Sequence, residues 1–191
     1  MRLLITGAPG AGKGTLAGAV ADHYSIPAIS TGNMFRAAAA SGSELGRQVG
    51  AIMASGGLVP DDVTDAVVAA RLAEPDAAAG WLLDGYPRTL AQVKALDDLL
   101  AGRSESLDLV IVLDVPRDVM VARLVHRASI EGRADDTVET IRHRMEVYAA
   151  STAPILDAYA ARDLVLTVDG DGTPDEVRER LLAALIARLG H

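Results

Sequence analysis

A glycine-rich segment near the N-terminus carries the clearest chemical signal in the sequence. Residues 7–15 read Gly-Ala-Pro-Gly-Ala-Gly-Lys-Gly-Thr, between a short apolar run and a helical pattern. They match the phosphate-loop template G-x-x-x-x-G-K-[ST], except that Gly14 stands at the hydroxyl position and Thr15 follows it. Glycines let backbone N–H groups surround an anion, and the next helix directs its positive end toward it. The segment therefore predicts a phosphate-binding loop rather than a plain glycine-rich turn. Lys13, one of only two lysines, would add a point charge.

A second group of polar residues follows the third apolar run. Asp84 ends that run, and the chain continues Gly-Tyr-Pro-Arg-Thr to residue 89. A carboxylate at this place suits Mg²⁺, which prefers oxygen ligands and keeps several waters. Arg88 lies just beyond a predicted strand end, where α/β proteins bind ligands, and a guanidinium can hold two phosphate oxygens at once. The alternatives are an Asp that caps a turn and an Arg that is solvated in a loop.

Arginine is concentrated in one later stretch. Five of the 16 arginines fall within 22 positions: Arg123, Arg127, Arg133, Arg142 and Arg144. The first two are four residues apart and so share one helical face. A solvated face paired with nearby acids is the alternative, and we adopt that interpretation for Arg142. The four histidines lack metal-ligand spacing, so we expect them to be surface residues.

The elements that position these residues alternate along the chain. Short apolar runs are separated by helical patterns, which predicts a parallel sheet covered on both faces. The runs are 3–5, 28–29, 81–83, 109–113 and 164–168. Helix starts are predicted near Pro60, Thr89, Pro116 and Thr173, the last as a capping box. Pro154 should break a long helical pattern. Residues 30–60, which hold two short helical patterns, and the Arg-rich residues 126–136 read as insertions.

The amino-acid composition limits the class of protein and the kinds of binding partner. A chain of 191 residues is one domain. Half of the residues are hydrophobic but only 3% are aromatic, so the core must be aliphatic. The net charge of −8 argues against nucleic-acid and membrane-surface partners. There is no cysteine, which excludes disulfides and thiolate zinc sites. No apolar stretch reaches the length of a membrane span or a signal peptide, so we expect a cytoplasmic protein.

The motif at residues 7–15 resembles that of the adenylate kinase family, the nucleoside monophosphate kinases. Four further segments can be compared with that family. They are Ser30-Thr31-Gly32-x-x-Phe35-Arg36, Leu58-Val59-Pro60, the Asp-Gly-Tyr-Pro-Arg-Thr segment with Gln92 after it, and Gly132-Arg133-Ala134-Asp135-Asp136. All of them resemble family motifs and occur in the family's order. The resemblance extends from residue 7 to residue 173, so it covers most of the chain.

The resemblance implies an architecture. We expect the α/β three-layer fold of P-loop NTPases, with a five-stranded parallel sheet, a helical monophosphate-binding insert and a short lid. The implied division is a core of residues 1–29, 60–125 and 137–191, an insert of residues 30–59 and a lid of residues 126–136. Some family members hold zinc through cysteines in a longer lid. This chain has no cysteine and a short lid, so we expect no zinc.

The resemblance also implies site residues. The ATP side would use Gly10, Ala11, Gly12, Lys13, Gly14, Thr15, Arg123, Arg127 and Gly172. The AMP side would use Thr31, Arg36, Gly57, Leu58, Val59, Gly85, Tyr86, Pro87, Arg88, Gln92, Arg133 and Arg144. The residues expected to act in the transfer itself are Lys13, Arg88, Arg127, Arg133 and Arg144. Mg²⁺ would lie near Thr15 and Asp84, bound largely through water.

The expected activity is the reversible, Mg²⁺-dependent transfer of a phosphoryl group from ATP to AMP, giving two ADP, by a monomer. Gln92 and Thr31 would recognise adenine; a solvated helix residue and a helix N-cap are the alternatives. The alternative enzymes are a UMP/CMP kinase or a GTP-dependent AMP kinase of the same fold. A non-catalytic nucleotide-binding regulatory protein is a more remote alternative. A pure binder would need neither a second phosphate clamp nor a cluster of lid arginines.

Overall fold

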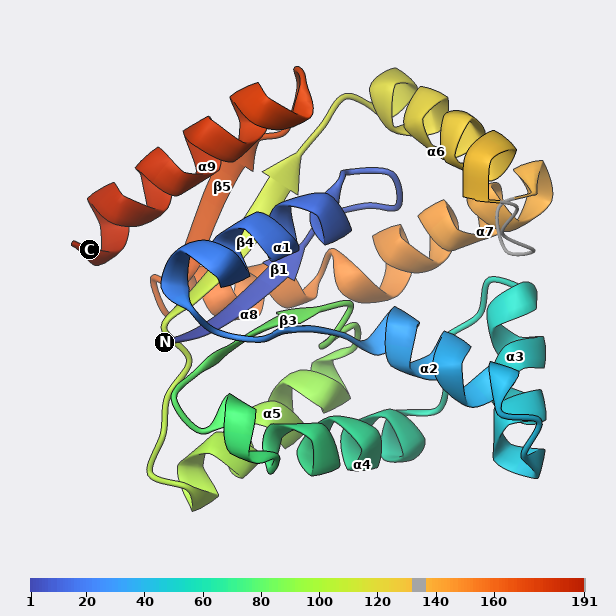
Figure 1. The fold of residues 1–191 in the computed structure, drawn as a ribbon, viewed down its shortest axis with the longest axis horizontal. Coiled ribbons are helices and arrows are strands. Elements are labelled where there is room, and N and C mark those ends of the chain that lie inside the picture. The colour runs from blue at the N-terminus through green and yellow to red at the C-terminus, as the bar shows by residue number, and fades with distance from the viewer. Residues whose placement is uncertain (132–136, 191) are drawn as a thin grey trace.

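A five-stranded parallel sheet forms the centre of the molecule (Figure 1). The computed structural model describes residues 1–131 and 137–190, and the side chains of residues 127–131 lie outside that description. The strand order is β2-β3-β1-β4-β5, and every neighbouring pair is parallel. The strands are β1 (Arg2–Thr6), β2 (Ala28–Ser30), β3 (Trp81–Asp84), β4 (Leu109–Asp114) and β5 (Val165–Asp169). The five apolar runs and the parallel sheet that they predict are therefore confirmed.

Helices connect the strands. In chain order they are α1 (Lys13–Tyr24), α2 (Thr31–Ala40), α3 (Glu44–Ala54), α4 (Asp61–Leu72), η1 (Pro75–Ala77), α5 (Leu90–Gly102), α6 (Arg117–Glu131), α7 (Val138–Val147), the π-helical turn η2 (Tyr148–Thr152), α8 (Ile155–Ala160) and α9 (Pro174–Leu189). None of the helices within the described residues is both long enough and apolar enough to cross a membrane.

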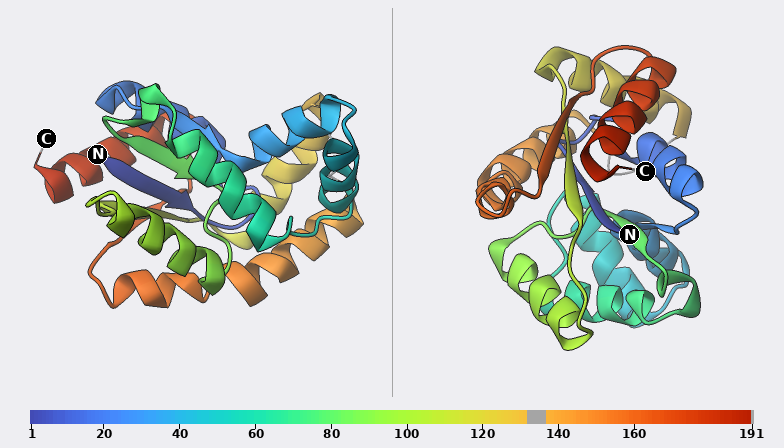
Figure 2. Two further views of the ribbon diagram at one scale, coloured as in Figure 1. Left: turned by 90° about the horizontal axis from the view of Figure 1, so that it is seen from below. Right: turned by 90° about the vertical axis from the view of Figure 1, so that its left-hand side faces the viewer.

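The two faces of the sheet are covered by different helices, which makes three layers (Figure 2). Successive side chains of a strand point to opposite faces. Leu3 and Ile5 accordingly pack in a cluster with apolar residues of α1 and α9. Leu4, between them, packs in a second cluster with residues of α4, α5 and α8. This two-sided burial explains why the strands read as continuous apolar runs rather than as alternating ones.

Helix ends follow the predicted signals. Thr173 and Glu176 form the reciprocal capping box at the start of α9. Thr89 caps α5 by accepting a hydrogen bond from the Gln92 backbone N–H. The long helical pattern breaks where Pro154 predicts, and the turn before this proline is π-helical. A proline cannot donate the hydrogen bond that would continue an α-helix through it.

Helices α2 and α3 leave the sheet after β2 and pack on each other. They share a small apolar cluster built on Phe35, Val49 and Val59. Their close approach depends on Gly46, where a Cβ atom would lie 2.1 Å from the Ala38 carbonyl oxygen. The two short helices predicted in this stretch are therefore present. We keep the division into core, insert and lid as a proposal.

Candidate functional site

The glycine-rich loop connects β1 to α1 and curls around the position of Lys13. Gly12 caps α1 with a left-handed backbone (φ 90°), and Lys13 is the first residue of the helix. Lys13 Nζ donates hydrogen bonds to the carbonyl oxygens of Gly7 (2.7 Å) and Ala8 (3.1 Å). The ammonium group thus lies over the loop at the positive end of a helix. Both features attract phosphate oxygens.

Gly10 fixes this loop against the start of α6. Its φ is +87°, a conformation that side chains with a Cβ rarely adopt. A Cβ atom here would lie 2.5 Å from the Met120 carbonyl oxygen and 2.9 Å from Leu124 Cγ. The contact leaves no room for any other residue. The shape of the phosphate loop is therefore supported by α6, the helix that also carries Arg123.

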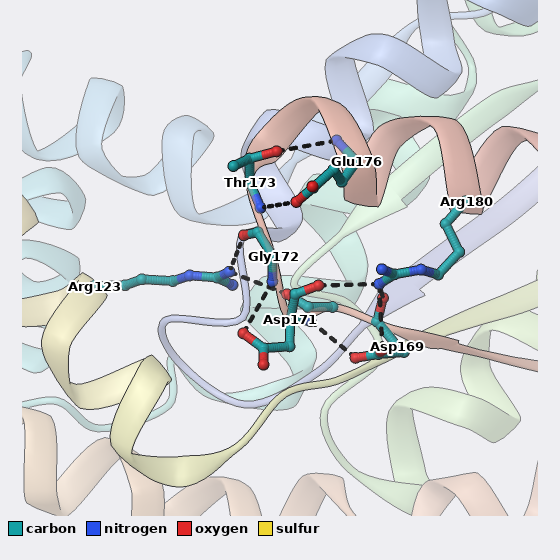
Figure 3. Close-up of polar contacts among 8 residues, drawn as sticks. Arg123, Asp169, Asp171, Gly172, Thr173, Glu176 and Arg180 are labelled. Atoms are coloured by element: carbon teal, nitrogen blue, oxygen red, sulfur yellow. Dashed lines mark hydrogen bonds and ion pairs between the residues drawn. The ribbon is translucent and has the colours of Figure 1, made fainter.

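Arg123 joins three of the segments predicted for the donor side (Figure 3). Its Nη2 donates hydrogen bonds to the carbonyl oxygens of Gly170 (3.0 Å) and Gly172 (3.1 Å). Its Nη1 would lie 3.8 Å from a Cβ atom placed on Gly12, so the guanidinium group also lies beside the phosphate loop. The structure thus brings Arg123, Gly172 and the loop together, although residues far apart in the sequence supply them.

Arg88 is held from three sides. Its backbone N–H donates to Gln92 Oε1 (2.7 Å), and its side-chain Nε donates to the Gly85 carbonyl oxygen (2.8 Å). Its own carbonyl oxygen accepts a hydrogen bond from Thr152 Oγ1 (3.2 Å). The contacts come from α5, from the loop after β3 and from η2. They fix the backbone of Arg88 and aim the guanidinium end of its side chain.

Three arginines, Arg36, Arg88 and Arg144, line one cavity. Burial lowers the pKa of Arg88, and the nearby charge of Asp84 acts in the opposite direction. Arg144 and Arg36 add smaller effects that also lower this pKa, because like charges disfavour the charged form. An arginine remains charged in spite of such effects. Three positive side chains in the wall of one cavity favour a polyanion.

Two adjoining cavities are lined by positively charged side chains from this group. The first is lined by Lys13 and Gly7 of the phosphate loop, by Tyr86, Pro87 and Arg88, and by residues of α7 and η2. The second is lined by residues predicted for the monophosphate side: Thr31, Arg36, Gly57, Leu58, Val59, Gly85, Arg88, Gln92 and Arg144. Arg88 and Arg144 line both cavities. The two cavities therefore share two arginines in their walls.

Gln92 and Thr31 are both buried in the wall of the second cavity, each about 2% exposed. Thr31 Oγ1 donates its proton to the Asp84 carbonyl oxygen (3.3 Å), which leaves oxygen lone pairs for another donor. Gln92 Nε2 donates to Asp61 Oδ1 (2.7 Å). Neither residue matches its alternative, since Gln92 is not solvated and the N-cap of α2 is Ser30. Their role toward a base stays a prediction.

Comparison with known proteins gives the family. The sequence profile described as "Adenylate kinase" matches residues 5–164, which is most of the chain. The chain belongs to the adenylate kinase family. A protein named "Adenylate kinase" from Clavibacter michiganensis is 55% identical over 187 residues, covering 98% of this chain and 94% of the relative. A protein of the same name from Nocardioides is 51% identical over 185 residues, covering 97% of each. Another from Leifsonia xyli is 53% identical over 186 residues, covering 97% and 94%.

Asp84 is the residue predicted to serve a metal ion in this member of the adenylate kinase family. Its position in β3 pairs with Ile5 of β1, one residue before the end of that strand. The carboxylate is therefore at the same edge of the sheet as the phosphate loop. Thr15 lies in the first turn of α1 and is exposed. One carboxylate and one hydroxyl are oxygen ligands of the kind that Mg²⁺ prefers, together with water.

The sequence analysis missed three side chains beside the adenylate kinase site. Tyr148 and Thr152, both in the π-helical turn η2, line the first cavity. Burial raises the pKa of Tyr148, and a hydrogen bond with Thr6 partly offsets that effect. Asn33 Oδ1 accepts a hydrogen bond from Arg36 Nη2 (2.6 Å) and orients it. In the sequence, this contact is indicated only by the spacing of Asn33 and Arg36, which are one helical turn apart.

Two predicted residues fall outside the described part of the structure. Arg133 lies among residues 132–136, and the side chain of Arg127 is not described. Arg144, which was predicted with them to act in the transfer, lies on α7 and lines both cavities. The roles of Arg127 and Arg133 toward the phosphates stay predictions.

Proposed function

We propose that this chain transfers the terminal phosphoryl group of ATP to AMP, reversibly, and so interconverts ATP and AMP with two ADP. The observation that carries the proposal is the pair of adjoining cavities with Arg88 and Arg144 in the wall of each. Lys13 of the glycine-rich loop lines one cavity, and Arg36 lines the other, where it could bind a second phosphate. A protein that binds one nucleotide without transfer would need only the first. Membership of the adenylate kinase family supports the same activity.

The chain's own residues would act by positioning and by charge. The amides of the phosphate loop and Lys13 bind the donor phosphates. Arg36 and Arg88 hold the acceptor phosphate, and Arg144 lies where charge develops between the two. Phosphoryl transfer requires in-line placement and charge neutralisation rather than a covalent intermediate. Mg²⁺ bound near Thr15 and Asp84 would supply further neutralisation. Exclusion of water from the acceptor side would prevent water from competing for the phosphoryl group, and Gln92 is buried there.

The choice of acceptor follows from Gln92 and Thr31. We expect a strong preference for AMP over CMP, UMP and GMP, measured as kcat/KM with ATP as the donor. A buried amide that hydrogen-bonds one base rejects a mismatched one by about 10⁴–10⁵ when polar groups are left unpaired. Gln92→Leu should reduce this preference while leaving the affinity for ATP close to that of the wild type. Comparable efficiencies with AMP and CMP in the wild type would instead support the UMP/CMP kinase alternative.

The metal requirement forms a separate prediction. Activity should disappear when divalent cations are removed and should return on addition of Mg²⁺, because Asp84 and Thr15 offer oxygen ligands only. A zinc-selective chelator should change neither turnover nor the melting temperature. Metal analysis of untagged protein provides the check. Stoichiometric zinc whose removal lowers both activity and stability would contradict the prediction.

We further infer that the protein works as a cytoplasmic monomer without nucleic-acid or membrane partners. The acidic net charge and the cysteine-free sequence support this setting. Light scattering in the presence and absence of nucleotides tests the oligomeric state.

A further inference from the structure

The side-chain amide of Gln92 is held in one orientation by two different neighbours. Its Oε1 accepts from the Arg88 backbone N–H (2.7 Å), and its Nε2 donates to Asp61 Oδ1 (2.7 Å). A backbone N–H can only donate, and an ionised carboxylate can only accept. A flip of the amide would place two donors together at Arg88 and two acceptors together at Asp61. At a side chain about 2% exposed, water cannot relieve that conflict.

Asp61 is itself held in place. It is the first residue of α4, directly after Pro60. Its second oxygen, Oδ2, accepts a hydrogen bond from Thr89 Oγ1 (2.9 Å), and Thr89 caps the helix that carries Gln92. The carboxylate therefore bridges the start of α4 and the start of α5. Its position relative to Gln92 depends on two contacts to α5 and not on one.

The fixed orientation matters because the amide of Gln92 has a hydrogen-bond donor at its nitrogen and an acceptor at its oxygen, and a flip exchanges their positions. With one bond made by each group, Gln92 still has one Nε2 hydrogen and one Oε1 lone pair to offer. These match a base with an acceptor at ring position 1 and an amino donor at position 6, which is adenine. Hypoxanthine has nearly the same size and shape, but it carries a donor at position 1 and an acceptor at position 6. A flipped amide would match hypoxanthine equally well.

We propose that Asp61 is a positioning residue that locks the Gln92 amide and thereby selects a 6-amino purine over a 6-oxo purine as the acceptor. The inference rests on the proposed function, in which Gln92 faces the acceptor base. Asp61 does not touch the base in this account. It acts through the amide, and the Arg88 N–H alone would oppose a flip less strongly.

The test compares AMP and IMP as acceptors for Asp61→Asn. Asparagine has the size of aspartate but can present either a donor or an acceptor to Gln92. We expect the ratio of kcat/KM for IMP to that for AMP to rise by roughly tenfold or more, as for relief of one unpaired buried group. KM for ATP should remain unchanged. Asp61→Glu keeps an acceptor-only carboxylate and should retain a ratio closer to that of the wild type.

Asp65→Asn is the matched control. Asp65 lies one helical turn further along α4 and accepts a hydrogen bond from the Tyr86 hydroxyl (2.7 Å), so it joins α4 to the loop between β3 and α5. Within the described part of the chain, no hydrogen bond is found between Asp65 and the side-chain amide of Gln92. The control should leave the IMP-to-AMP ratio unchanged. An equal rise in both variants would show that a looser junction, and not the amide, sets the ratio, and would overturn the proposal.

Gln92→Leu separates this inference from the proposed function. If it abolishes the discrimination between AMP and IMP while Asp61→Asn leaves that discrimination intact, the lock is wrong and base recognition by Gln92 stands. If Gln92→Leu itself keeps the wild-type ratio, Gln92 does not recognise the base and the underlying proposal fails. An Asp61→Asn protein that loses thermal stability with an unchanged ratio would give Asp61 a structural role only, which also overturns the proposal.

Discussion

Turnover should fall by at least about 10³ in Lys13→Met, by analogy with the loss of a single group that stabilises transition-state charge. Lys13 is the first residue of α1, and its Nζ lies over the Gly7 and Ala8 carbonyl oxygens of the phosphate loop. Methionine has a similar length and no charge, so the loop loses its cation without a large loss of volume. The steady-state rate of ADP formation measures the effect.

Lys94→Met provides the matched control, because it removes the only other lysine. Lys94 is exposed on α5, and its ion pair with Asp98 spans one helical turn. Exposed pairs of this kind contribute little to stability. We expect wild-type turnover from this control and a melting temperature within a few degrees of the wild type for both variants. A Lys13→Met protein that folds and turns over normally would show that the loop does not hold the transferred phosphate.

Arg88→Ala should also lower turnover by about 10³ or more, since a guanidinium positioned at the transferred group supplies rate factors of this order. The substitution should weaken the binding of one nucleotide only. The residue lies on the acceptor side, held by Gln92, Gly85 and Thr152. The affinity for AMP should drop, and that for ATP should stay close to the wild type. Isothermal titration calorimetry with each nucleotide separately gives the two affinities.

Arg142→Ala is the control for Arg88, because Arg142 is exposed on α7 and we interpret it as a solvated residue. It should leave turnover and both affinities unchanged. Arg88→Lys tests the role of shape: lysine keeps the charge but cannot bind two oxygens in the planar manner of a guanidinium. We expect it to restore only a small part of the lost activity. Loss of ATP binding with intact AMP binding in Arg88→Ala would mean that the two sides are assigned in reverse.

Local signals predicted much of the fold. The apolar runs identified all five strands of the sheet. The signal is clearest for β1, β3 and β4, because strands buried on both faces carry nearly continuous apolar residues. Thr89, Pro154 and Thr173 marked helix ends because capping and the missing proline N–H act within a few residues. The phosphate loop was readable for the same reason, since its chemistry lies within nine consecutive residues.

The contacts that join distant segments could not be predicted in this way. No local signal indicates that Thr152 would donate to the Arg88 carbonyl oxygen, which is 64 positions away. The π-helical turn that places Thr152 there has no clear sequence pattern. The pairing of Asp61 with Gln92 across 31 positions depends on how α4 and α5 pack. The sequence could indicate the chemistry of each segment. The hydrogen bonds that orient Arg88 and Gln92 depend on how distant segments pack, so only the three-dimensional structure reveals them.

The most direct test of the central claim is the stoichiometry of the wild-type reaction. ATP, AMP and Mg²⁺ are mixed with the purified protein, and all three adenine nucleotides are quantified over time by chromatography. The account predicts that two ADP form for each ATP and AMP consumed, that no inorganic phosphate accumulates, and that ADP alone returns to the same equilibrium mixture. Consumption of ATP with release of inorganic phosphate and no loss of AMP would contradict it, because water and not AMP would then be the acceptor.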